Sequence, residues 1–456
     1  MTVTNDNLKL IIFPKKIEPS PFFNWWLVWL IIICVINTGL EAATLSEIHG
    51  YSRLEYRGRW SETQEDQDLY QYLSLELGKE GRDKITGSFF GRLSADIDGR
   101  QSGNSFYPFA DITDTYQDNI NGRIYQAYLD FNDVRYLSKL RLGRQYVYEG
   151  ETVQFDGARL ELKPYWENID LSLYGGVPTH LYESSLSGDW ILGTGIEGRP
   201  LDGTRLRLDY VYVEDDNATW GDHNDDLIIL SGWQRVRDNL NLNGKYSFLD
   251  KKERDASLRA NLNYPDKDLS FQASYFRQLE TLRDFSVEFS PFYPVAGEYF
   301  PFHQYDFSCR KGFGEKLGIE AGITTRDLVE DTTETNFNHE YDRYFITLSI
   351  YEFLLEDTEF SITAEQWSSN DDIRTLGFEA EKKFNKSVEV KVGSYYSLYK
   401  YDYYTSQERD DVRTAFLELE LKPWKKKDVE WEIRYELEDD DFDVYHTLKT
   451  GIKCNF

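Results

Sequence analysis

The sequence predicts an all-β fold: a transmembrane antiparallel β-barrel of about 22 strands, within a range of roughly 16 to 24, with short periplasmic turns and long extracellular loops. Three observations predict it. Apolar and polar residues alternate along most of the chain, the connecting segments sort by length, and the last strand ends on an aromatic residue.

The alternation is clearest in residues 429–438, VEWEIRYELE, where apolar residues at odd positions alternate with charged residues at even ones. Successive side chains of a strand point to opposite faces, so one face of this strand is apolar and the other is charged. The same period recurs in residues 258–264, 269–275, 317–323 and 415–421, and no helical period separates these segments.

The connecting segments fall into a short and a long set. The short set is rich in Lys and Arg, and the long set is rich in Asp, Glu, Tyr and Ser. We expect the short connections on the periplasmic side and the long ones outside, with both termini in the periplasm if the strand number is even. The long set is 59–69, 97–120, 177–188, 214–225, 279–301, 327–340 and 400–411.

A soluble β-sandwich also alternates, but it buries its apolar faces in a core. Here the polar faces carry many charges, no domain boundary interrupts the strands, and the connections sort by length. In lipid every backbone polar group must be paired, so a sheet has to close on itself. A closed barrel with apolar side chains toward lipid and polar ones toward an aqueous lumen explains all three features.

The N-terminal segment has the pattern of a secretory signal. Basic residues precede the apolar run 25–36, and small residues including Ala42 and Ala43 follow it. We expect residues 1–43 to be a cleaved signal peptide and residues 44–456 to form the outer-membrane barrel. A retained membrane anchor is the alternative, although the apolar run is short for a spanning helix.

Composition narrows the class of protein further. The formal net charge is −29, which disfavours nucleic acid and anionic lipid surfaces as partners and favours cations or a basic protein. Solvated acidic loops are the simpler explanation of the same excess. Aromatic residues make up 16% of the chain and mean hydropathy is −0.59, which excludes a bundle of membrane helices.

The sequence contains no recognisable cofactor or catalytic motif. Its three cysteines lack metal-site or haem-attachment spacing, so we expect no cofactor and no metal, while a Cys309–Cys454 disulfide stays open. His180 beside Ser184 and Ser185 could be read as a strand-end hydrolase site, but we expect an exposed loop histidine and no enzyme. The acidic stretches 214–226 and 438–443 are read as solvated loops or as divalent-cation sites.

The C-terminal strand, TLKTGIKCNF, places Leu448, Ile452 and Phe456 on one face. It resembles the C-terminal signal of bacterial outer-membrane barrels that the barrel assembly machinery reads. The resemblance implies an outer-membrane location, outer-membrane lipid and the assembly machinery as partners, and Phe456 as the assembly signal.

Residues 139–150 (KLRLGRQYVYEG) and 153–164 (VQFDGARLELKP) resemble porin-type outer-membrane proteins, in which a strand ending in G-R-Q precedes one beginning D-G-A. Residues 66–78 and 175–190 resemble barrels of metal-reducing Gram-negative bacteria. The porin resemblance implies passive passage of small hydrophilic solutes or ions. The second resemblance implies an alternative, a scaffold barrel sheathing a multihaem cytochrome in an outer-membrane electron conduit.

Charged side chains that alternation directs into the lumen are the candidate selectivity residues. The same residues could instead form cross-strand pairs that only stabilise the wall. A barrel of 22 strands is wide enough to need a filler, which segments 97–120 and 279–301 or a separate protein could supply. The candidates are Arg205, Arg207, Asp209, Lys245, Arg259, Glu418, Glu420, Glu430, Glu432 and Arg434.

Overall fold

The structure is a computed structural model. It describes residues 48–62, 64–98, 109, 120–148, 152–164, 168–179, 188–217, 221–280, 300–330, 340–352, 355–368, 373–402, 407–423, 428–440 and 443–456. The segment predicted as a signal peptide, residues 1–43, lies outside the described residues.

These residues form a single antiparallel sheet of 22 strands. The strands are β1 (Ile48–Trp60), β2 (Glu65–Leu77), β3 (Ile85–Asp96), β4 (Ile120–Val134), β5 (Leu137–Val147), β6 (Val153–Leu162), β7 (Ile169–Pro178), β8 (Trp190–Gly198), β9 (Thr204–Asn217), β10 (Gly221–Arg237), β11 (Leu240–Leu249), β12 (Lys252–Tyr264), β13 (Leu269–Gln278), β14 (Phe302–Phe313), β15 (Leu317–Leu328), β16 (Tyr341–Tyr351), β17 (Thr358–Ser368), β18 (Ile373–Asn385), β19 (Val388–Asp402), β20 (Gln407–Leu421), β21 (Val429–Asp439) and β22 (Val444–Asn455).

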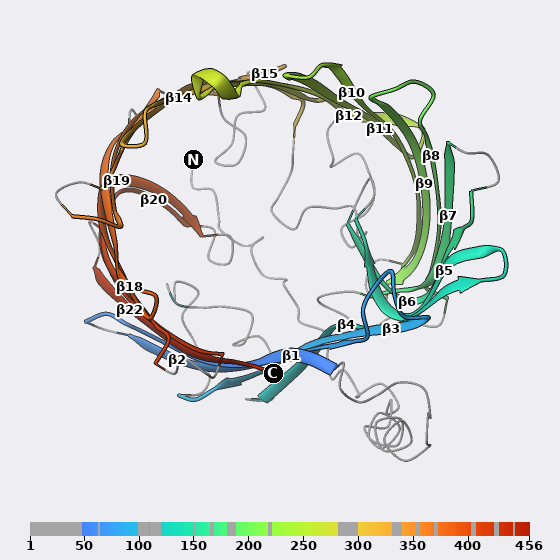
Figure 1. Cartoon of the computed structure of the whole chain (residues 1–456), viewed down its shortest axis with the longest axis horizontal. Helices are drawn as coiled ribbons and strands as arrows, with labels where there is room; N and C mark the ends of the chain where they lie inside the picture. Colours follow the sequence, from blue (N-terminus) through green and yellow to red (C-terminus); the bar gives the residue numbers. More distant parts are fainter. Residues whose placement is uncertain are drawn as a thin grey trace, which may run out of the picture.

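The sheet closes on itself, because β1 pairs with both β2 and β22. Seen down its axis, the sheet is a ring with consecutive strands as neighbours (Figure 1). The last residue takes part in the closure: the Phe456 amide donates to the Gly50 carbonyl at 3.0 Å, and the Gly50 amide donates to the Phe456 carbonyl at 2.9 Å. A closed ring leaves no strand edge unpaired, as a sheet in hydrocarbon requires. The predicted all-β barrel of about 22 strands is confirmed.

The connections sort by end, as predicted, but less evenly than predicted. At one end, which we call the short-turn end, no connection between consecutive strands is longer than seven residues; 199–203 and 386–387 are examples. The four longest connections, 97–119, 179–189, 279–301 and 329–340, all lie at the opposite end. Three segments predicted as long loops are largely strand instead, because neighbouring strands extend their pairing past the polar residues; they are 59–69, 214–225 and 400–411.

The exposure pattern assigns the two faces of the wall. On β1 and β22, Leu54 and Ile452 are 44% and 45% exposed, whereas Asp68 on the other face of β2 is fully buried. The exposed large apolar side chains of the strands therefore cover the outside, and most of the charged ones line the interior; the Arg144–Asp156 pair is an exception on the outer face. Among the described residues no helix is long and apolar enough to cross a membrane; the helix that the structure contains is the single 3-10 turn Pro265–Lys267.

One hairpin departs from the cylindrical wall. Seen down the axis, β20 leans from the wall beside β19 into the ring (Figure 1). The pairing of β19 with β20 shifts register after Tyr395 and again after Leu398, and Ser397 between them has a positive φ of 63°. Such bulges bend a strand and increase its local twist, so they account for the inward lean.

Candidate functional site: the charged lumen

The lumen-facing residues of β17–β21 form a strongly acidic surface, here named the acidic wall. Where the structure describes the side chains of these strands, the register places eleven glutamates on this surface, against three basic residues, Lys383, Lys391 and Arg434. The glutamates are Glu359, Glu365, Glu379, Glu381, Glu389, Glu418, Glu420, Glu430, Glu432, Glu436 and Glu438.

Three of these glutamates stand in one row across neighbouring strands. Glu389 on β19 is directly opposite Glu420 on β20, and Glu420 is directly opposite Glu432 on β21. Like charges placed directly opposite one another destabilise a sheet. At the end of the row, Arg53 Nη2 lies 3.2 Å from Glu432 and 2.8 Å from Glu55, so its single charge is shared between two carboxylates.

The next row of the acidic wall is better compensated. Arg434 lies 3.0 Å from Glu418 across the strands and 3.0 Å from Glu436 along its own strand. Lys391 lies 2.9 Å from Glu379. Arg434 therefore acts here as a cross-strand partner. The row of Glu389, Glu420 and Glu432 is compensated only at its two ends, where Lys383 lies 3.8 Å from Glu389 and Arg53 lies 3.2 Å from Glu432.

The lumen-facing residues of β1–β5, here named the paired wall, carry nearly equal numbers of acids and bases. Arg57 Nη2 lies 2.5 Å from the buried Asp68, and Arg59 pairs with Asp66. The wall consists of Arg53, Arg57, Arg59, Arg92, Arg123, Lys139 and Arg141 with Glu55, Asp66, Asp68, Glu76, Asp96 and Asp130.

Arg57, Arg59 and Arg141 each donate two hydrogen bonds to a carboxylate, and the Arg141–Asp130 pair has the fork geometry that makes such pairs strong. Arg141 donates through Nε and Nη2 to the two oxygens of Asp130, at 2.7 and 2.8 Å. Two parallel charged hydrogen bonds fix both side chains in place. The paired wall is therefore rigid and electrically almost neutral.

Five predicted selectivity residues lie on β9–β12, where four of them have ionic partners. Arg207 donates to both oxygens of the buried Asp209, at 2.7 to 2.9 Å. Arg205 lies 3.2 Å from Glu197, and Lys245 lies 4.0 Å from Asp255. Arg259 is exposed, and no described residue is recorded as its ion-pair partner.

The structure thus divides the predicted residues into two groups. Glu418, Glu420, Glu430, Glu432 and Arg434 share β20 and β21, and the other five lie on a different arc of the ring (Figure 1). The paired wall was missed by the prediction, although the alternation in residues 53–59 and 65–72 directs the same charges inward. Nothing in either segment alone shows that β1 and β2 are neighbours in the register that pairs them.

An apolar lumen surface was also not foreseen, since the sequence predicts polar lumen faces. Ten lumen-facing side chains of β5–β11, here named the inner apolar patch, cluster together, and each is at most 6% exposed. Two of its strands read VYV (211–213) and LIIL (227–230) without a polar gap, because the lumen-facing side chains are buried and the outward-facing ones belong to the apolar outer surface. The patch is Val147, Val153, Phe155, Tyr174, Ile191, Val211, Val213, Leu227, Ile229 and Leu249.

Segment 97–120, predicted as a possible lumen filler, lies mostly outside the described residues, but Phe109 is described. Its ring centroid lies 5.7 Å from that of Tyr445 in an edge-on contact, and Arg59 lies 5.6 Å above its face. Both partners face the lumen, on β22 and β1. Phe109 therefore sits inside the barrel against the paired wall. The other predicted filler, 279–301, is described only at its ends.

The glycines of the G-R-Q and D-G-A motifs have a clear structural role. Gly143 pairs directly with Gly157, and Gly157 pairs with Gly176, so three glycines form one row on the lumen face of β5–β7. A Cβ added to Gly157 would lie 2.1 Å from the Gly175 carbonyl oxygen. No side chain fits there, and Gln145 folds over the row to donate to the Gly157 carbonyl at 3.2 Å.

The remaining predictions concern cysteines, histidines and metals. Cys309 and Cys454 are free thiols on the outer face of distant strands, β14 and β22, so they form no disulfide. His180, Ser184 and Ser185 lie outside the described residues. Among the residues that the structure describes, no group of three or more His, Cys, Asp or Glu side chains is arranged to hold a metal ion.

The fold and its lumen define the class: a closed, large, antiparallel β-barrel with an ionic interior. No protein-family model matches the chain, and no curated protein matches it. Among solved structures, the chain is similar to the translocation pore of the P pilus usher PapC, with 11% identity and a TM-score of 0.50 over 90% of this chain and 99% of that chain.

Two porin structures are also similar. They are a BenF-like porin from Pseudomonas fluorescens Pf-5 (10% identity, TM-score 0.44, 92% of this chain and 100% of that one) and OccAB4 from Acinetobacter baumannii (9% identity, TM-score 0.42, 92% and 100%). At such identities similarity concerns the fold alone. Of the three, the PapC pore alone reaches a TM-score of 0.50, so the support for the barrel fold rests on it.

Proposed function

We propose that the chain is a porin: a pore-forming protein of the outer membrane of a Gram-negative bacterium that lets small hydrophilic solutes or ions pass passively. The observation that carries this proposal is the closed barrel with exposed apolar side chains outside and ionic rows inside. Only a closed sheet satisfies its backbone in hydrocarbon, and a charged interior is suited to water and ions.

The burial pattern supports a particular route through the lumen. The inner apolar patch is withdrawn from water, and Phe109 covers part of the paired wall near Arg59. The acidic wall has no comparable cover among the described residues over its short-turn half, where Glu430 and Glu432 keep side chains 41% and 42% exposed. We infer that solutes pass along the acidic wall and that its surplus negative charge favours cations over anions.

Planar-bilayer recording tests this proposal directly. The full-length protein, purified in detergent, should produce step conductances in KCl, and its reversal potential in a KCl gradient should indicate preference for K⁺. Complete absence of conductance would overturn the porin proposal, and preference for Cl⁻ would overturn the route along the acidic wall. A haem protein that co-purifies with a non-conducting barrel would instead favour the alternative function, a scaffold barrel around a multihaem cytochrome.

The remaining assignments complete the proposal. Residues 1–43 act as the export signal, residues 44–456 form the barrel, and the strand ending at Phe456 is the segment that the barrel assembly machinery reads. Phe456 is 58% exposed and its backbone is paired with Gly50, so its ring is accessible while its strand closes the barrel. The protein has no catalytic role in this scheme, and its lipid partner is the surrounding outer membrane.

A further inference from the structure

The outer face of β1–β3 carries a polar side chain at the middle of the wall. Gln71 is the central residue of β2, and the register places it on the outer face, directly opposite Leu54 on β1 and Leu93 on β3. These two leucines are 44% and 50% exposed, and Leu73, the next outward residue of β2, is exposed as well. Gln71 therefore lies within the apolar belt that the proposed porin turns toward hydrocarbon.

The Gln71 side chain forms only part of the hydrogen bonds that it could form. Its Nε2 donates to Ser52 Oγ on β1 at 2.9 Å and to the Tyr72 carbonyl at 3.0 Å. Within the described part of the chain, no donor reaches the Gln71 side-chain oxygen, and no acceptor receives the Ser52 hydroxyl hydrogen. In hydrocarbon, where water is absent, a polar group without a partner costs free energy. The pair thus presents one acceptor and one donor, side by side, to the outside.

The outer surface around this pair is flat. On β1 the Tyr56 ring lies over Gly58, where an added Cβ would be 2.7 Å from the Tyr56 hydroxyl oxygen, and that hydroxyl donates to Gln67 Oε1 at 3.2 Å. On β3 the Phe89 ring likewise lies over Gly91, with 3.1 Å between an added Cβ and Phe89 Cζ. Both rings lie along the wall instead of projecting from it. Small residues on a membrane-embedded face allow a second backbone to approach closely.

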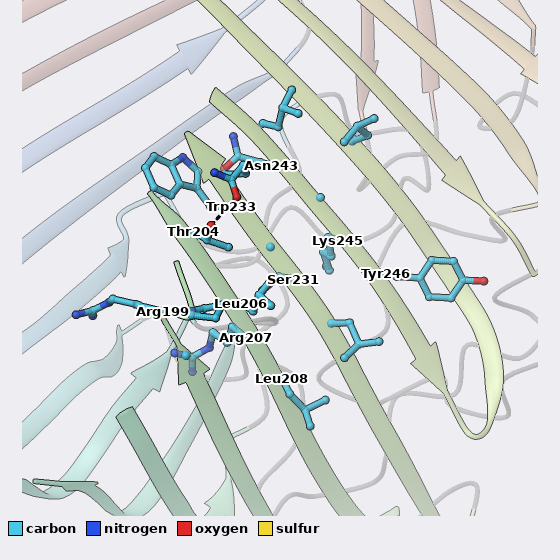
Figure 2. Close-up of a pocket in the computed structure, with 18 of the residues that line it drawn as sticks. Arg199, Thr204, Leu206, Arg207, Leu208, Ser231, Trp233, Asn243, Lys245 and Tyr246 are labelled. Carbon is cyan, nitrogen blue, oxygen red and sulfur yellow. Dashed lines mark hydrogen bonds between the residues drawn. The ribbon is translucent and has the colours of Figure 1, made fainter. Parts of the chain in front are cut away.

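The outer face of β8–β13 has a different character. It contains a hollow of about 1140 Å³ whose floor is the backbone at Gly232 and Gly244. Its walls are mainly apolar side chains that include Leu206 and Leu208 (Figure 2). Lipid tails are as apolar as leucine, so hydrocarbon can cover such a surface without any protein partner. The Gln71–Ser52 pair, in contrast, requires a partner that both donates and accepts.

We propose that the outer face of β1–β3 is the interface of a two-fold dimer, in which the Ser52 hydroxyl of each copy donates to the Gln71 side-chain oxygen of the other. Acyl chains offer neither donor nor acceptor at this depth, whereas the same face of a second copy offers both. This proposal rests on the proposed function only for the membrane location of the barrel.

The geometry of the membrane permits both bonds at once. Two copies in one membrane have the same orientation, so a two-fold axis between them runs along the membrane normal and keeps each residue at its own depth. Ser52 and Gln71 are bonded to each other within one chain, so their polar atoms lie at nearly the same depth. An axis beside the pair therefore brings the donor of each copy to the acceptor of the other.

The mass of the full-length protein in a mild detergent, measured by light scattering over a range of protein concentrations, tests the proposal. The wild type should be a dimer that dissociates on dilution. Gln71→Leu removes the acceptor of both bonds and should raise the dissociation constant about tenfold. Ser52→Ala removes the donors and should have a similar effect. The double variant should be no weaker than either single one, because all three lack the same two bonds.

Gln366→Leu is the matched control. Gln366 lies on the outer face of β17, directly opposite Tyr344 and away from β1–β3, so the same substitution should leave the dissociation constant unchanged. Tryptophan fluorescence shows that each variant is folded. A monomer at every concentration, a trimer, or equal weakening by Gln71→Leu and Gln366→Leu would overturn the proposal. So would a dimer that both Gln71→Leu and Ser52→Ala leave intact, because the contact would then lie elsewhere.

Bilayer conductance of the same preparations separates the dimer from the proposed function. A conducting wild type that is monomeric overturns only the dimer. A non-conducting wild type that is dimeric, and that Gln71→Leu dissociates, overturns only the porin.

Discussion

The paired wall and the acidic wall both consist of acidic and basic side chains, but only on the paired wall do the two kinds balance. On the paired wall Asp66, Asp68 and Asp130 each meet an arginine, and the charges cancel within a few ångströms. On the acidic wall glutamates outnumber bases and three of them stand directly opposite one another. Both faces are lumen-facing and equally polar in sequence.

The difference shows that one part of a lumen can contribute to stability while another part determines ion selectivity. Buried carboxylates need partners, because leaving one charge unpaired and withdrawn from water lowers the free energy of unfolding by ~3 kcal/mol or more. Half-exposed carboxylates do not, because water solvates them, and their uncancelled charge extends into the pore. We therefore expect substitutions in the paired wall to change the free energy of unfolding, and substitutions in the acidic wall to change the ion preference of the pore.

The largest effect is expected at Asp68. Removing this fully buried carboxylate in Asp68→Ala leaves Arg57 without its 2.5 Å partner in the wall, which should lower the free energy of unfolding by ~3 kcal/mol. Urea unfolding of the refolded barrel in detergent, followed by tryptophan fluorescence, measures the change. Glu420→Ala on the acidic wall is the matched control and should cost less than ~0.5 kcal/mol. If both variants lost the same free energy of unfolding, the proposed difference between the two walls would be wrong.

Neutralising the glutamate row should change selectivity next most strongly. The triple variant Glu389→Gln, Glu420→Gln, Glu432→Gln removes three facing charges, so the K⁺/Cl⁻ permeability ratio should fall about threefold, equivalent to ~0.6 kcal/mol. Reversal potentials in a KCl gradient give the ratio. Glu80→Gln, in a turn outside the barrel wall, should leave the ratio unchanged; a ratio unaffected by the triple variant contradicts the proposed route.

Placing a cation into the row should make the acidic wall resemble the paired one. Gly451 on β22 is directly opposite Glu432, and a Cβ there would meet nothing closer than Arg53 Nε at 3.4 Å. Gly451→Lys therefore fits and should lower the permeability ratio about twofold through one added charge. Gly451→Gln, which adds similar length without charge, separates the charge effect from pore narrowing. The proposed charge effect fails if both variants change the ratio alike.

The smallest effect concerns the turn after β2. A hydrogen bond from Lys139 and its charge lower the pKa of Glu80 below its ordinary value. A carboxyl group whose pKa is lower in the folded than in the unfolded protein stabilises the fold at pH values above its unfolded-state pKa. This stabilisation is lost as the pH falls through the folded-state pKa. Glu80 is largely exposed, so Glu80→Gln should cost at most ~0.5 kcal/mol at pH 7.

The pH dependence of the free energy of unfolding tests the Glu80–Lys139 pair. At pH 3, where the Glu80 carboxylate is progressively protonated, the difference between wild type and Glu80→Gln should shrink. Urea unfolding at pH 7 and pH 3 measures both values. A difference that grows on acidification would have the wrong sign for a carboxylate with a lowered pKa and would exclude this ion pair as its source.

Much of the barrel follows from local pattern. The period of two in residues 429–438 predicts two faces of β21, and the register places Glu430, Glu432 and Arg434 together on one of them. The short connections 199–203 and 312–316 contain glycine and charged residues, and Gly203 and Gly314 have positive φ values of 73° and 67°. Strands and turns are readable because each depends on residues close together in the chain.

By itself, the sequence determined the class, an antiparallel β-barrel of about 22 strands, and the two faces of regularly alternating segments such as residues 429–438, since alternation is a local property. Only the tertiary structure decided that Arg57 meets Asp68, that Glu389, Glu420 and Glu432 face one another, and that Gly232 and Gly244 open a hollow. Those outcomes depend on the register between strands, which shifts with every turn length and bulge and which no single strand encodes.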